Sequence, residues 1–276
     1  MKILVTGANG YLGQGVVKQL LDKGHEVIAT DFALNHVDPR AKLVQGNIFE
    51  VTNPYITYDR PDTLLHMAWR DGFKHNSQNH FLDLSKHYEF IKSAIESGIK
   101  KICIIGSMHE VGFFEGCIDE NTPTNPQSLY GISKNSLRQS IEVLKRENNF
   151  KFMWLRGFYI VGNNQYGCSV FSKIQIAVEN GEQIFPFTLG ENQYDFLDYD
   201  MFCHQVAAAV CQDEVLGIIN CCSGKPMRLK DRVEQFLSDN NYNIKLAYGT
   251  FPDRPYDSKA IWGNNDKIMK ILQNEK

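Results

Sequence analysis

The chain has 276 residues, of which 43% are hydrophobic and 22% charged, and its formal net charge is −3 at pH 7. This ordinary globular composition argues against intrinsic disorder and gives no electrostatic reason to expect a nucleic acid or an anionic membrane as partner. No apolar run approaches the roughly 20 residues that a membrane-spanning helix needs, and the N-terminus leads directly into a strand pattern without signal-peptide features, so we expect a cytoplasmic location.

The first half of the chain alternates short β-branched runs with segments of helical periodicity. Near-continuous apolar runs, typical of parallel strands covered on both faces, predict strands at Lys2–Thr6, Glu26–Thr30, Lys42–Gln45, Thr63–Met67, Lys101–Ile105 and Lys151–Arg156. Helical periodicity predicts helices at Leu12–Lys23, Asn79–Ser97 and Pro126–Glu147, the first ended by Gly24 and the last begun by Asn125-Pro126. This alternation predicts an α/β fold with a doubly wound parallel sheet.

After about residue 157 the alternation is less regular. Helices are predicted at Ser169–Asn180, Met201–Cys211 and Leu229–Leu237, and strands at Gln183–Phe187, Gly217–Cys221 and Ile244–Tyr248. No linker or low-complexity tract separates the two halves. We therefore expect a first domain of residues 1–160, to which segments near 190–222 return, and a small C-terminal cap formed mainly by residues 161–276.

The cysteines give no sign of a disulfide framework or a metal site. They lie at positions 103, 117, 168, 203, 211, 221 and 222, none in a CxxC pair, and the histidines show no HExxH spacing. An odd number of scattered cysteines indicates reduced, mostly buried thiols. We predict no bound metal.

A glycine-rich segment, Thr6-Gly7-Ala8-Asn9-Gly10-Tyr11-Leu12-Gly13, follows the first predicted strand and opens the first helix. Gly7 permits the tight turn, Gly10 lets the backbone approach a pyrophosphate, and Gly13 allows close packing of helix on strand. The helix N-terminus offers N–H groups and a positive dipole end to phosphates. This strand–turn–helix context predicts dinucleotide binding by the first domain.

The second predicted strand is followed by Asp31, 18 residues after Gly13. A carboxylate at this point can accept hydrogen bonds from the adenosine ribose and repels a 2′-phosphate. No arginine directly follows it. We expect NAD(H) to be favoured, with NADP(H) as the other possibility, while an N-cap or loop aspartate is the structural alternative.

Tyr130 and Lys134 are four residues apart on a predicted helix, which places them on one face. A free tyrosine titrates near pH 10, so we expect the nearby ammonium of Lys134 to lower the phenol pKa and allow proton exchange with an alcohol oxygen. Ser107 follows the fifth predicted strand, where ligands of doubly wound sheets collect, and can hold the substrate oxygen beside Tyr130.

These features together resemble the extended short-chain dehydrogenase/reductase family, in its nucleotide-sugar epimerase, dehydratase and reductase branch. The similarity runs through nearly the whole chain: Thr6–Gly13 resembles the family's glycine motif, Leu65–Ala68 its strand end, and Ser107, Tyr130 and Lys134 its catalytic triad. The resemblance implies a Rossmann-like domain, a C-terminal substrate-binding cap, a nucleotide-sugar substrate and a homodimer.

The resemblance also implies the contacts of each ligand. Cofactor contacts are implied at Gly7, Asn9, Gly10, Tyr11, Leu12, Gly13, Asp31, Asn47, Ile48, Met67, Ala68, Trp69, Tyr130 and Lys134. Substrate contacts are implied at Ser107, His109, Arg70 and Arg254, the last because Asp253–Asp257 resembles a motif whose arginine meets the nucleotide diphosphate. For His109 a structural role in a loop is an equal alternative, and the three tryptophans are more typical of packing.

The chain departs from the family pattern at several positions. Asn47 replaces an aspartate that contacts adenine, Tyr159 replaces an asparagine near the pyrophosphate, and Tyr194 replaces an arginine. Met108 and His109 occupy the positions of the Asp-Glu pair that sugar 4,6-dehydratases use to eliminate water, which argues against dehydratase activity.

The sequence is most similar to the dTDP-4-dehydro-6-deoxyglucose reductases of that branch. This implies NAD(P)H-dependent reduction of the C4 keto group of a nucleotide-linked 4-keto-6-deoxy sugar, such as dTDP-4-keto-6-deoxyglucose, for polysaccharide biosynthesis. A nucleotide-sugar 4-epimerase or an NAD-retaining sugar dehydrogenase would use the same residues and stays open. A non-catalytic dinucleotide sensor is the alternative outside the enzymes, although such proteins commonly lose the tyrosine–lysine pair.

Overall fold

The computed structural model describes residues 1–162, 169–252 and 257–275. Within them, seven parallel strands form one sheet in the order β11-β7-β5-β4-β1-β2-β3. Their bounds are β1 (Lys2–Thr6), β2 (Glu26–Asp31), β3 (Lys42–Gln45), β4 (Thr63–His66), β5 (Lys101–Ser107), β7 (Lys151–Gly157) and β11 (Gly217–Cys221). All seven predicted strands of this sheet are confirmed to within two residues.

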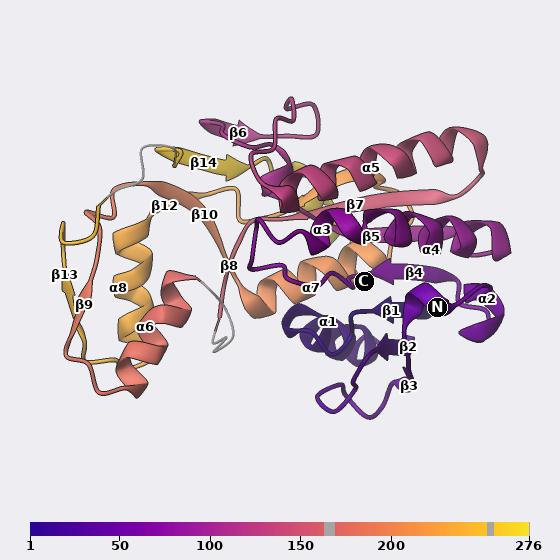
Figure 1. Ribbon diagram of the computed structural model, residues 1–276, viewed down its shortest axis with the longest axis horizontal. Coiled ribbons are helices and arrows are strands. Elements are labelled where there is room, and N and C mark those ends of the chain that lie inside the picture. The colour runs from indigo at the N-terminus through magenta and orange to yellow at the C-terminus, as the bar shows by residue number, and fades with distance from the viewer. Residues whose placement is uncertain (163–168, 253–256, 276) are drawn as a thin grey trace.

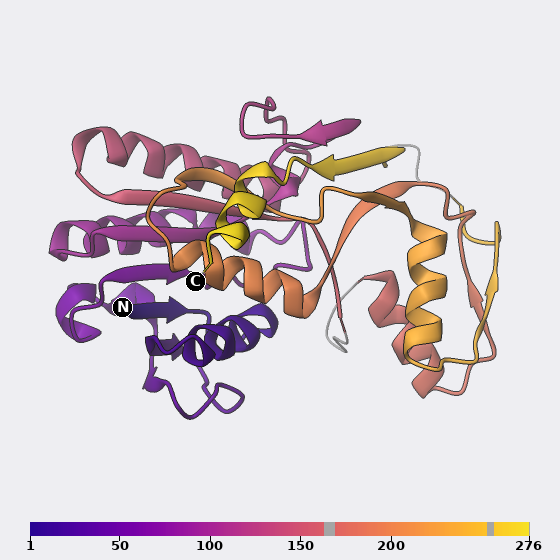
Figure 2. The ribbon, with the colours of Figure 1, turned by 180° about the vertical axis from the view of Figure 1, so that it is seen from behind.

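Helices cover both faces of this sheet (Figures 1 and 2), which confirms the α/β doubly wound fold. One face packs against α1 (Tyr11–Asp22), α7 (Tyr199–Val210) and α9 (Asp266–Gln273), and the other against α4 (Leu84–Ser97) and α5 (Leu129–Glu147). Burial of the inner strands on both sides explains their near-continuous apolar runs, whereas the edge strand β3 is mostly exposed. Because the strands are parallel, their carboxyl ends meet at one edge, where the candidate site lies.

Two predicted helices differ from the structure in detail. The segment 79–97 forms two helices, α3 (Asn79–Leu82) and α4, which meet at the buried Asp83, and this carboxylate pairs with Arg70 and Lys86. The helix expected from Pro126 begins at Leu129, because Ser128 is the residue that caps it. Gly24 has a φ of +78°, as its predicted place after the first helix requires.

A second group of elements lies to one side of the large sheet (Figure 1). The two helices α6 (Val170–Glu179) and α8 (Leu229–Asp239) share an apolar core with the paired strands β9 (Ile184–Pro186) and β13 (Lys245–Ala247). Connecting strands form a second sheet: β6 (Gly116–Ile118), β8 (Tyr159–Val161), β10 (Gln193–Asp198), β12 (Pro226–Arg228) and β14 (Ala260–Gly263). The predicted helices and strands of residues 169–248 are all confirmed, whereas the strands of this second sheet were not predicted.

Short elements complete the described chain: α2 (Pro54–Thr57) and the 3₁₀ turns η1 (Ile48–Glu50) and η2 (Met108–Glu110). None of the helices in the described ranges is both long and apolar enough to cross a membrane. The cysteines of those ranges are free thiols.

Candidate active site

The turn between β1 and α1 has the shape that its glycine spacing predicts. Gly7 has a φ of +70°, and a Cβ atom on it would lie 2.6 Å from the backbone nitrogen of Ala68, in the loop after β4. A Cβ atom on Gly13 would lie 2.2 Å from the carbonyl oxygen of Gly7. Gly10 precedes α1 without a side-chain cap, so the N-terminus of this helix can receive an anion.

The carboxylate of Asp31 lies at the end of β2 beside this turn. It accepts hydrogen bonds from the backbone N–H groups of Asn9 at 3.0 Å and Phe32 at 2.8 Å. Asp31 is partly exposed, and a carboxylate has further lone pairs for ribose hydroxyls. The side chain is thus a suitable acceptor next to the phosphate-binding turn.

The other residues predicted around the adenine and the nicotinamide are packed or hydrogen-bonded within the fold to different degrees. The side chain of Asn47 caps η1, accepting from Phe49 N–H at 3.1 Å and donating to Glu50 Oε1 at 2.9 Å, so an adenine contact would compete with this cap.

Ile48 is buried in the core, and the hydroxyl of Tyr11 is buried without a hydrogen-bond partner among the described residues. Leu12, Met67 and Ala68 pack partly buried against the sheet.

Tyr130 and Lys134 lie together on the first turns of α5, at the carboxyl end of β5. The N–H of Tyr130 donates to the carbonyl oxygen of His75 at 2.9 Å, which ties the loop after β4 to this helix. Lys134 is 2% exposed, and its Nζ donates to the carbonyl oxygen of Ile105 at 2.8 Å. Nζ is 6.0 Å from the centre of the Tyr130 ring.

Burial dominates the pKa of both groups. It raises the pKa of the Tyr130 phenol to about 12, a rise that the neighbouring Ser107 hydroxyl opposes. It lowers the pKa of the Lys134 ammonium to about 7, opposed by the carboxylate of Glu110. The expected net lowering of the phenol pKa is therefore wrong for this structure, because burial of the phenol away from water raises its pKa instead.

Ser107 ends β5 and is fixed by the turn that follows it. Its Oγ accepts a hydrogen bond from His109 N–H at 3.3 Å, while the Ser107 N–H donates to the Glu110 carboxylate at 2.5 Å. This reciprocal pair of hydrogen bonds is a capping box that opens η2. Ser107 is thereby held at the sheet edge next to Tyr130.

The Glu110 carboxylate is completely buried and anchors this turn to the core. It accepts hydrogen bonds from Trp154 Nε1 at 2.8 and 2.9 Å, and the guanidinium groups of Arg138 and Arg156 each lie 3.7 Å from it. Gly106 leaves room for this cluster, because a Cβ atom there would lie 2.0 Å from Trp154 Nε1. Sequence reasoning did not identify Glu110 as a residue of the site.

Aromatic rings enclose the phenol of Tyr130. The His75 ring stacks on it with centroids 5.4 Å apart, and His80, His109 and Trp69 lie at 5.3, 6.1 and 6.3 Å. The roles of His75 and His80 were missed, because these histidines lie in an irregular loop and a short helix where no periodicity marks them. Burial lowers the pKa of His75, and that of His109 to about 4, so both are neutral near pH 7.

A second pair of histidines is buried beneath this group. His66 Nδ1 lies 2.9 Å from Thr6 Oγ1, and His66 Nε2 lies 2.9 Å from His87 Nδ1. Burial lowers the pKa of His87 to about 3 and that of His66 well below its usual 6.5. Both rings are therefore held neutral in the folded protein.

This pair predicts a loss of stability in mild acid. A histidine whose folded pKa is lowered contributes stability above its unfolded value of 6.5, and this stability is lost as the pH falls toward the folded pKa. We expect each of the two to cost about 1.4 kcal/mol of unfolding free energy per pH unit below 6. Urea unfolding between about pH 7.5 and 5 measures this slope. His87→Gln should reduce it and the exposed control His36→Gln should not; equal slopes in both variants would contradict the assignment.

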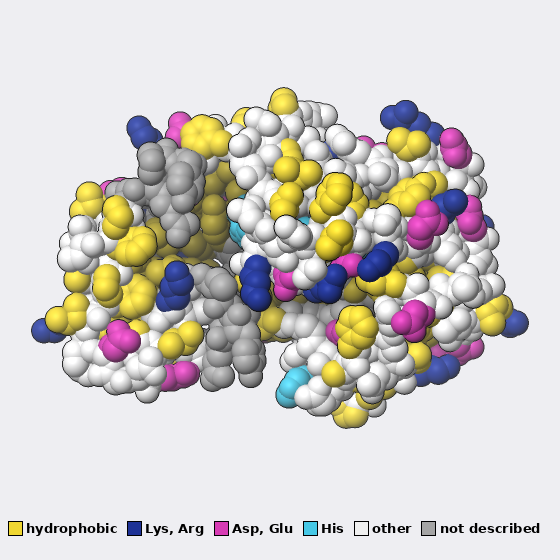
Figure 3. Space-filling view, in the orientation of Figure 1, with side chains coloured by type: hydrophobic (Ala, Val, Ile, Leu, Met, Phe, Trp, Pro, Cys, Tyr) yellow, Lys and Arg dark blue, Asp and Glu magenta, His cyan; other side chains and the backbone are white. Residues whose placement is uncertain are grey.

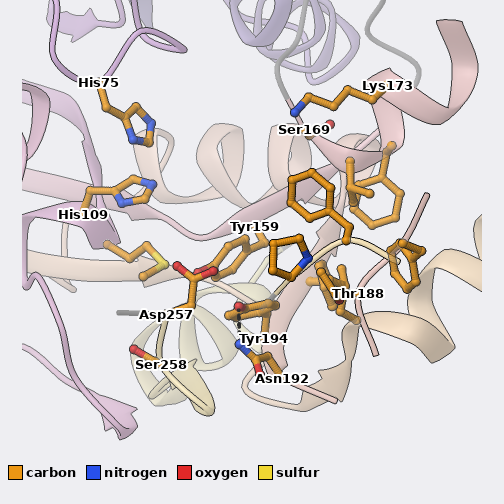
Figure 4. Close-up of a pocket in the computed structure, with 18 of the residues that line it drawn as sticks. His75, His109, Tyr159, Ser169, Lys173, Thr188, Asn192, Tyr194, Asp257 and Ser258 are labelled. Atoms are coloured by element: carbon orange, nitrogen blue, oxygen red, sulfur yellow. Dashed lines mark hydrogen bonds between the residues drawn. The ribbon is translucent and has the colours of Figure 1, made fainter. Parts of the chain in front are cut away.

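A cleft of about 1030 Å³ opens beside the enclosed tyrosine. His75 and His109 line one end of it, and Ser169, which caps α6, and Lys173 of α6 face it from the other side (Figure 4). Figure 3 shows the surface hollowed between the part with α6 and α8 and the larger body. The cleft thus joins the sheet edge to the smaller group of elements, with a histidine-lined end and a lysine-bearing end.

The predicted substrate residues lie in different places. His109 lines the cleft, and Ser107 is buried beside Tyr130. Arg70 forms an ion pair with Asp83, and it is not among the described residues that line the cleft. Arg254 lies outside the described residues.

The profile of the NAD dependent epimerase/dehydratase family matches residues 3–222. The chain belongs to this family. It is 43% identical over 269 residues to the dTDP-6-deoxy-L-talose 4-dehydrogenase (NAD(+)) of Aggregatibacter actinomycetemcomitans, covering 95% of this chain and 99% of that protein.

Solved structures of the family share the fold at lower identity. A UDP-N-acetylglucosamine 4-epimerase from Methanobrevibacter ruminantium superposes with a TM-score of 0.84 at 20% identity, over 100% of this chain and 92% of that one. The UDP-glucose 4-epimerase of Thermus thermophilus, in complex with NAD, gives a TM-score of 0.82 at 18% identity, over 98% and 92%. These structures show the shared fold. The family match and the 43% identical relative together show that the chain is an oxidoreductase of the short-chain dehydrogenase/reductase type.

Proposed function

We propose that this protein interconverts a dTDP-linked 6-deoxy-L-hexose and its 4-keto derivative, with NAD(H) as the redox partner. The 43% identity with a dTDP-6-deoxy-L-talose 4-dehydrogenase, over almost the whole of both chains, is the observation that carries the proposal. Oxidation of a C4 hydroxyl and reduction of the C4 ketone are two directions of one reaction. The reductase predicted from sequence is thus the reverse of the activity in that relative's name.

The residues of the glycine turn fit a dinucleotide. Side chains are excluded at Gly7 and Gly13, the N-terminus of α1 lacks a side-chain cap, and Asp31 offers a carboxylate at the ribose position. NAD, when bound, accepts or returns the hydride of C4. Lys134, at the inner side of this site, would donate to the ribose of the nicotinamide.

Tyr130 would exchange the proton of the C4 oxygen. With a pKa raised to about 12, the phenol is protonated near pH 7 and can donate to the oxygen of a ketone that is being reduced. Ser107 would hold the same oxygen by a hydrogen bond, and the neutral His75 and His109 line the cleft at this end. In the oxidative direction Tyr130 must first be deprotonated, so that direction is favoured by alkaline pH.

The direct experiment supplies purified protein with dTDP-6-deoxy-L-talose and NAD⁺ and follows the formation of NADH by absorbance. The reverse reaction, from NADH and the 4-keto sugar, should give dTDP-6-deoxy-L-talose identified by NMR. Turnover in both directions is expected. No NADH with this sugar or with its GDP- and UDP-linked analogues would refute the proposal, and tightly retained dinucleotide with interconversion of C4 epimers would establish a 4-epimerase instead.

The Asp31→Asn variant should relax the choice of cofactor. The amide keeps the size of the side chain and an acceptor for the Asn9 N–H, but it loses the charge that repels a 2′-phosphate. We expect the ratio of kcat/KM for NAD⁺ to that for NADP⁺ to fall about tenfold. Asp38→Asn, in the next loop and paired with Arg40, is the matched control and should not change the ratio. A wild-type protein that prefers NADP⁺ would contradict the role of Asp31.

We further propose that residues 1–160, with returning segments near 190–222, bind the dinucleotide, and that residues 161–276 mainly form the substrate-binding cap. Ser169 and Lys173 on α6 support this division, because they line the cleft opposite the sheet edge and can meet a diphosphate. A cytoplasmic location stays a prediction.

A homodimer is also proposed. Ile132 and Val143 on α5 are 40% and 50% exposed and, eleven residues apart, share one face of the helix, while α3 exposes Phe81 and Leu82 beside it. Exposed apolar side chains gathered in this way are typical of an interface. Light scattering should give twice the chain mass, and Val143→Lys should give a monomer. A monomeric wild type at micromolar concentration would contradict the dimer.

A further inference from the structure

Trp69 lies next to the ammonium of Lys134, and the reaction proposed above does not use it. The Nζ atom is 3.9 Å from the centre of the indole ring, close enough for a strong cation–π interaction. The resemblance implies a cofactor contact at Trp69 and gives it no part in holding Lys134.

Two histidines fix this indole. Trp69 Nε1 donates to His80 Nδ1 at 3.0 Å, and the His87 ring stacks on the indole with centroids 4.4 Å apart and planes 13° apart. His80 Nε2 in turn lies 3.0 Å from the carbonyl oxygen of Lys74, and His87 Nδ1 is hydrogen-bonded to His66 Nε2. The ring is therefore held on two sides by groups that keep its orientation.

Apart from the hydrogen bond that its Nζ donates to the Ile105 carbonyl oxygen at 2.8 Å, Lys134 has little other support for its positive charge. It is 2% exposed, and among the described residues no carboxylate lies within ion-pair distance of its Nζ. The titratable groups that act on it are Glu110 from the β5–η2 turn, His66 and His87 from β4 and α4, and Tyr130 from its own helix. Among these groups only the more distant carboxylate of Glu110 favours the charged form of Lys134. Burial lowers the pKa of the Lys134 ammonium to about 7.

We propose that Trp69 is a positioning residue, which holds the Lys134 ammonium against the face of its indole and keeps it charged, and so sets the pH range of the reaction. This inference rests on the proposed function for the part that Lys134 plays in turnover. The indole face attracts a cation most strongly where water is excluded, as it is around Lys134. Loss of the ring should therefore make Lys134 about tenfold easier to deprotonate.

The first test observes Lys134 directly and needs no substrate. In protein labelled with ¹³C at lysine Cε, the signal of Lys134 is identified by its loss in Lys134→Met, and its titration midpoint is measured by NMR. Trp69→Leu should lower the midpoint by about one pH unit, and Trp69→Phe, which keeps an aromatic face, by less than half of that. An unchanged or higher midpoint in Trp69→Leu overturns the proposal. An equal shift in both variants also overturns it. Both variants lose the hydrogen bond that Trp69 donates to His80, so an equal shift would come from that bond and not from the aromatic face.

A second series covers the case in which Trp69→Leu does not fold. Tryptophan with increasing numbers of ring fluorines at position 69 keeps the shape and the N–H donor but weakens the attraction of the ring face for a cation. The Lys134 midpoint should fall stepwise along the series. A constant midpoint would overturn the proposal. Trp262→Leu, in β14 and outside the cleft lining, is the matched control and should leave the midpoint unchanged.

Activity gives the third readout. With NADH and the 4-keto sugar, where Tyr130 acts in its protonated form, Trp69→Leu should lower kcat about tenfold near pH 8 and shift the alkaline fall of kcat to lower pH, with KM for the sugar changed less than twofold. A rise in KM with an unchanged pH profile would assign Trp69 to substrate binding and overturn the proposal. If the NMR midpoint shifts but the sugar is not turned over, the proposed substrate is wrong and the role of Trp69 stands.

Discussion

Tyr130→Phe is expected to lower kcat by about 10²- to 10⁴-fold, the range typical of a lost general acid or base. Phenylalanine keeps the ring that packs against His75 and His80, so it removes the phenol oxygen and little else. The KM for the sugar and the binding of NADH should change little, because the lost group acts on the reacting oxygen. Steady-state kinetics in both directions, with NADH binding followed by fluorescence, measures these effects.

A second tyrosine at the cleft provides the control. Tyr159 lines the cleft, and its ring lies against that of Tyr194 with centroids 4.5 Å and planes 34° apart. Tyr159→Phe should reduce kcat less than tenfold. If Tyr130→Phe kept more than a tenth of the wild-type kcat, proton transfer by Tyr130 would be refuted even though the cleft is correctly placed.

The large sheet could be predicted from the sequence because its inner strands are buried on both faces. Runs such as Lys2–Thr6 and Gly217–Cys221 are apolar at most positions, and their bounds in the structure match the prediction. The strands of the second sheet, such as Gly116–Ile118 and Pro226–Arg228, are too short for any periodicity to stand out. They form because distant segments pair with them, which no local pattern reveals.

The site divides in the same way. The glycine turn and the Tyr130–Lys134 pair are local motifs, and the structure brings both to the sheet edge. The enclosure of the phenol was not predictable, because His75 meets Tyr130 across 55 residues of chain. The direction of the phenol pKa was also missed, since it depends on burial that the sequence does not show.

Glu110→Ala is expected to destabilise the protein by about 3–5 kcal/mol, the range found when one partner of a buried ion pair is removed. Glu110 and the neighbouring Arg156 are both 0% exposed, so the variant leaves a buried guanidinium without its carboxylate partner. The N–H groups of Ser107 and Trp154 also lose their acceptor. Urea unfolding followed by circular dichroism measures the loss.

Arg138, the second arginine near the Glu110 carboxylate, offers a matched control, because it also pairs with a carboxylate at the surface. It bonds Glu142 at 2.7 Å, and the Glu142 side chain is 39% exposed, so Glu142→Ala should cost at most about 1 kcal/mol. Glu110→Gln keeps one oxygen as acceptor for Ser107 N–H, but it loses the charge and replaces the second acceptor oxygen by an NH₂ group. It should recover part of the activity that Glu110→Ala loses, because the position of Ser107 depends on that hydrogen bond while the stability depends on the charge as well. Equal losses of stability in Glu110→Ala and Glu142→Ala would mean that water, not Glu110, compensates the buried arginines.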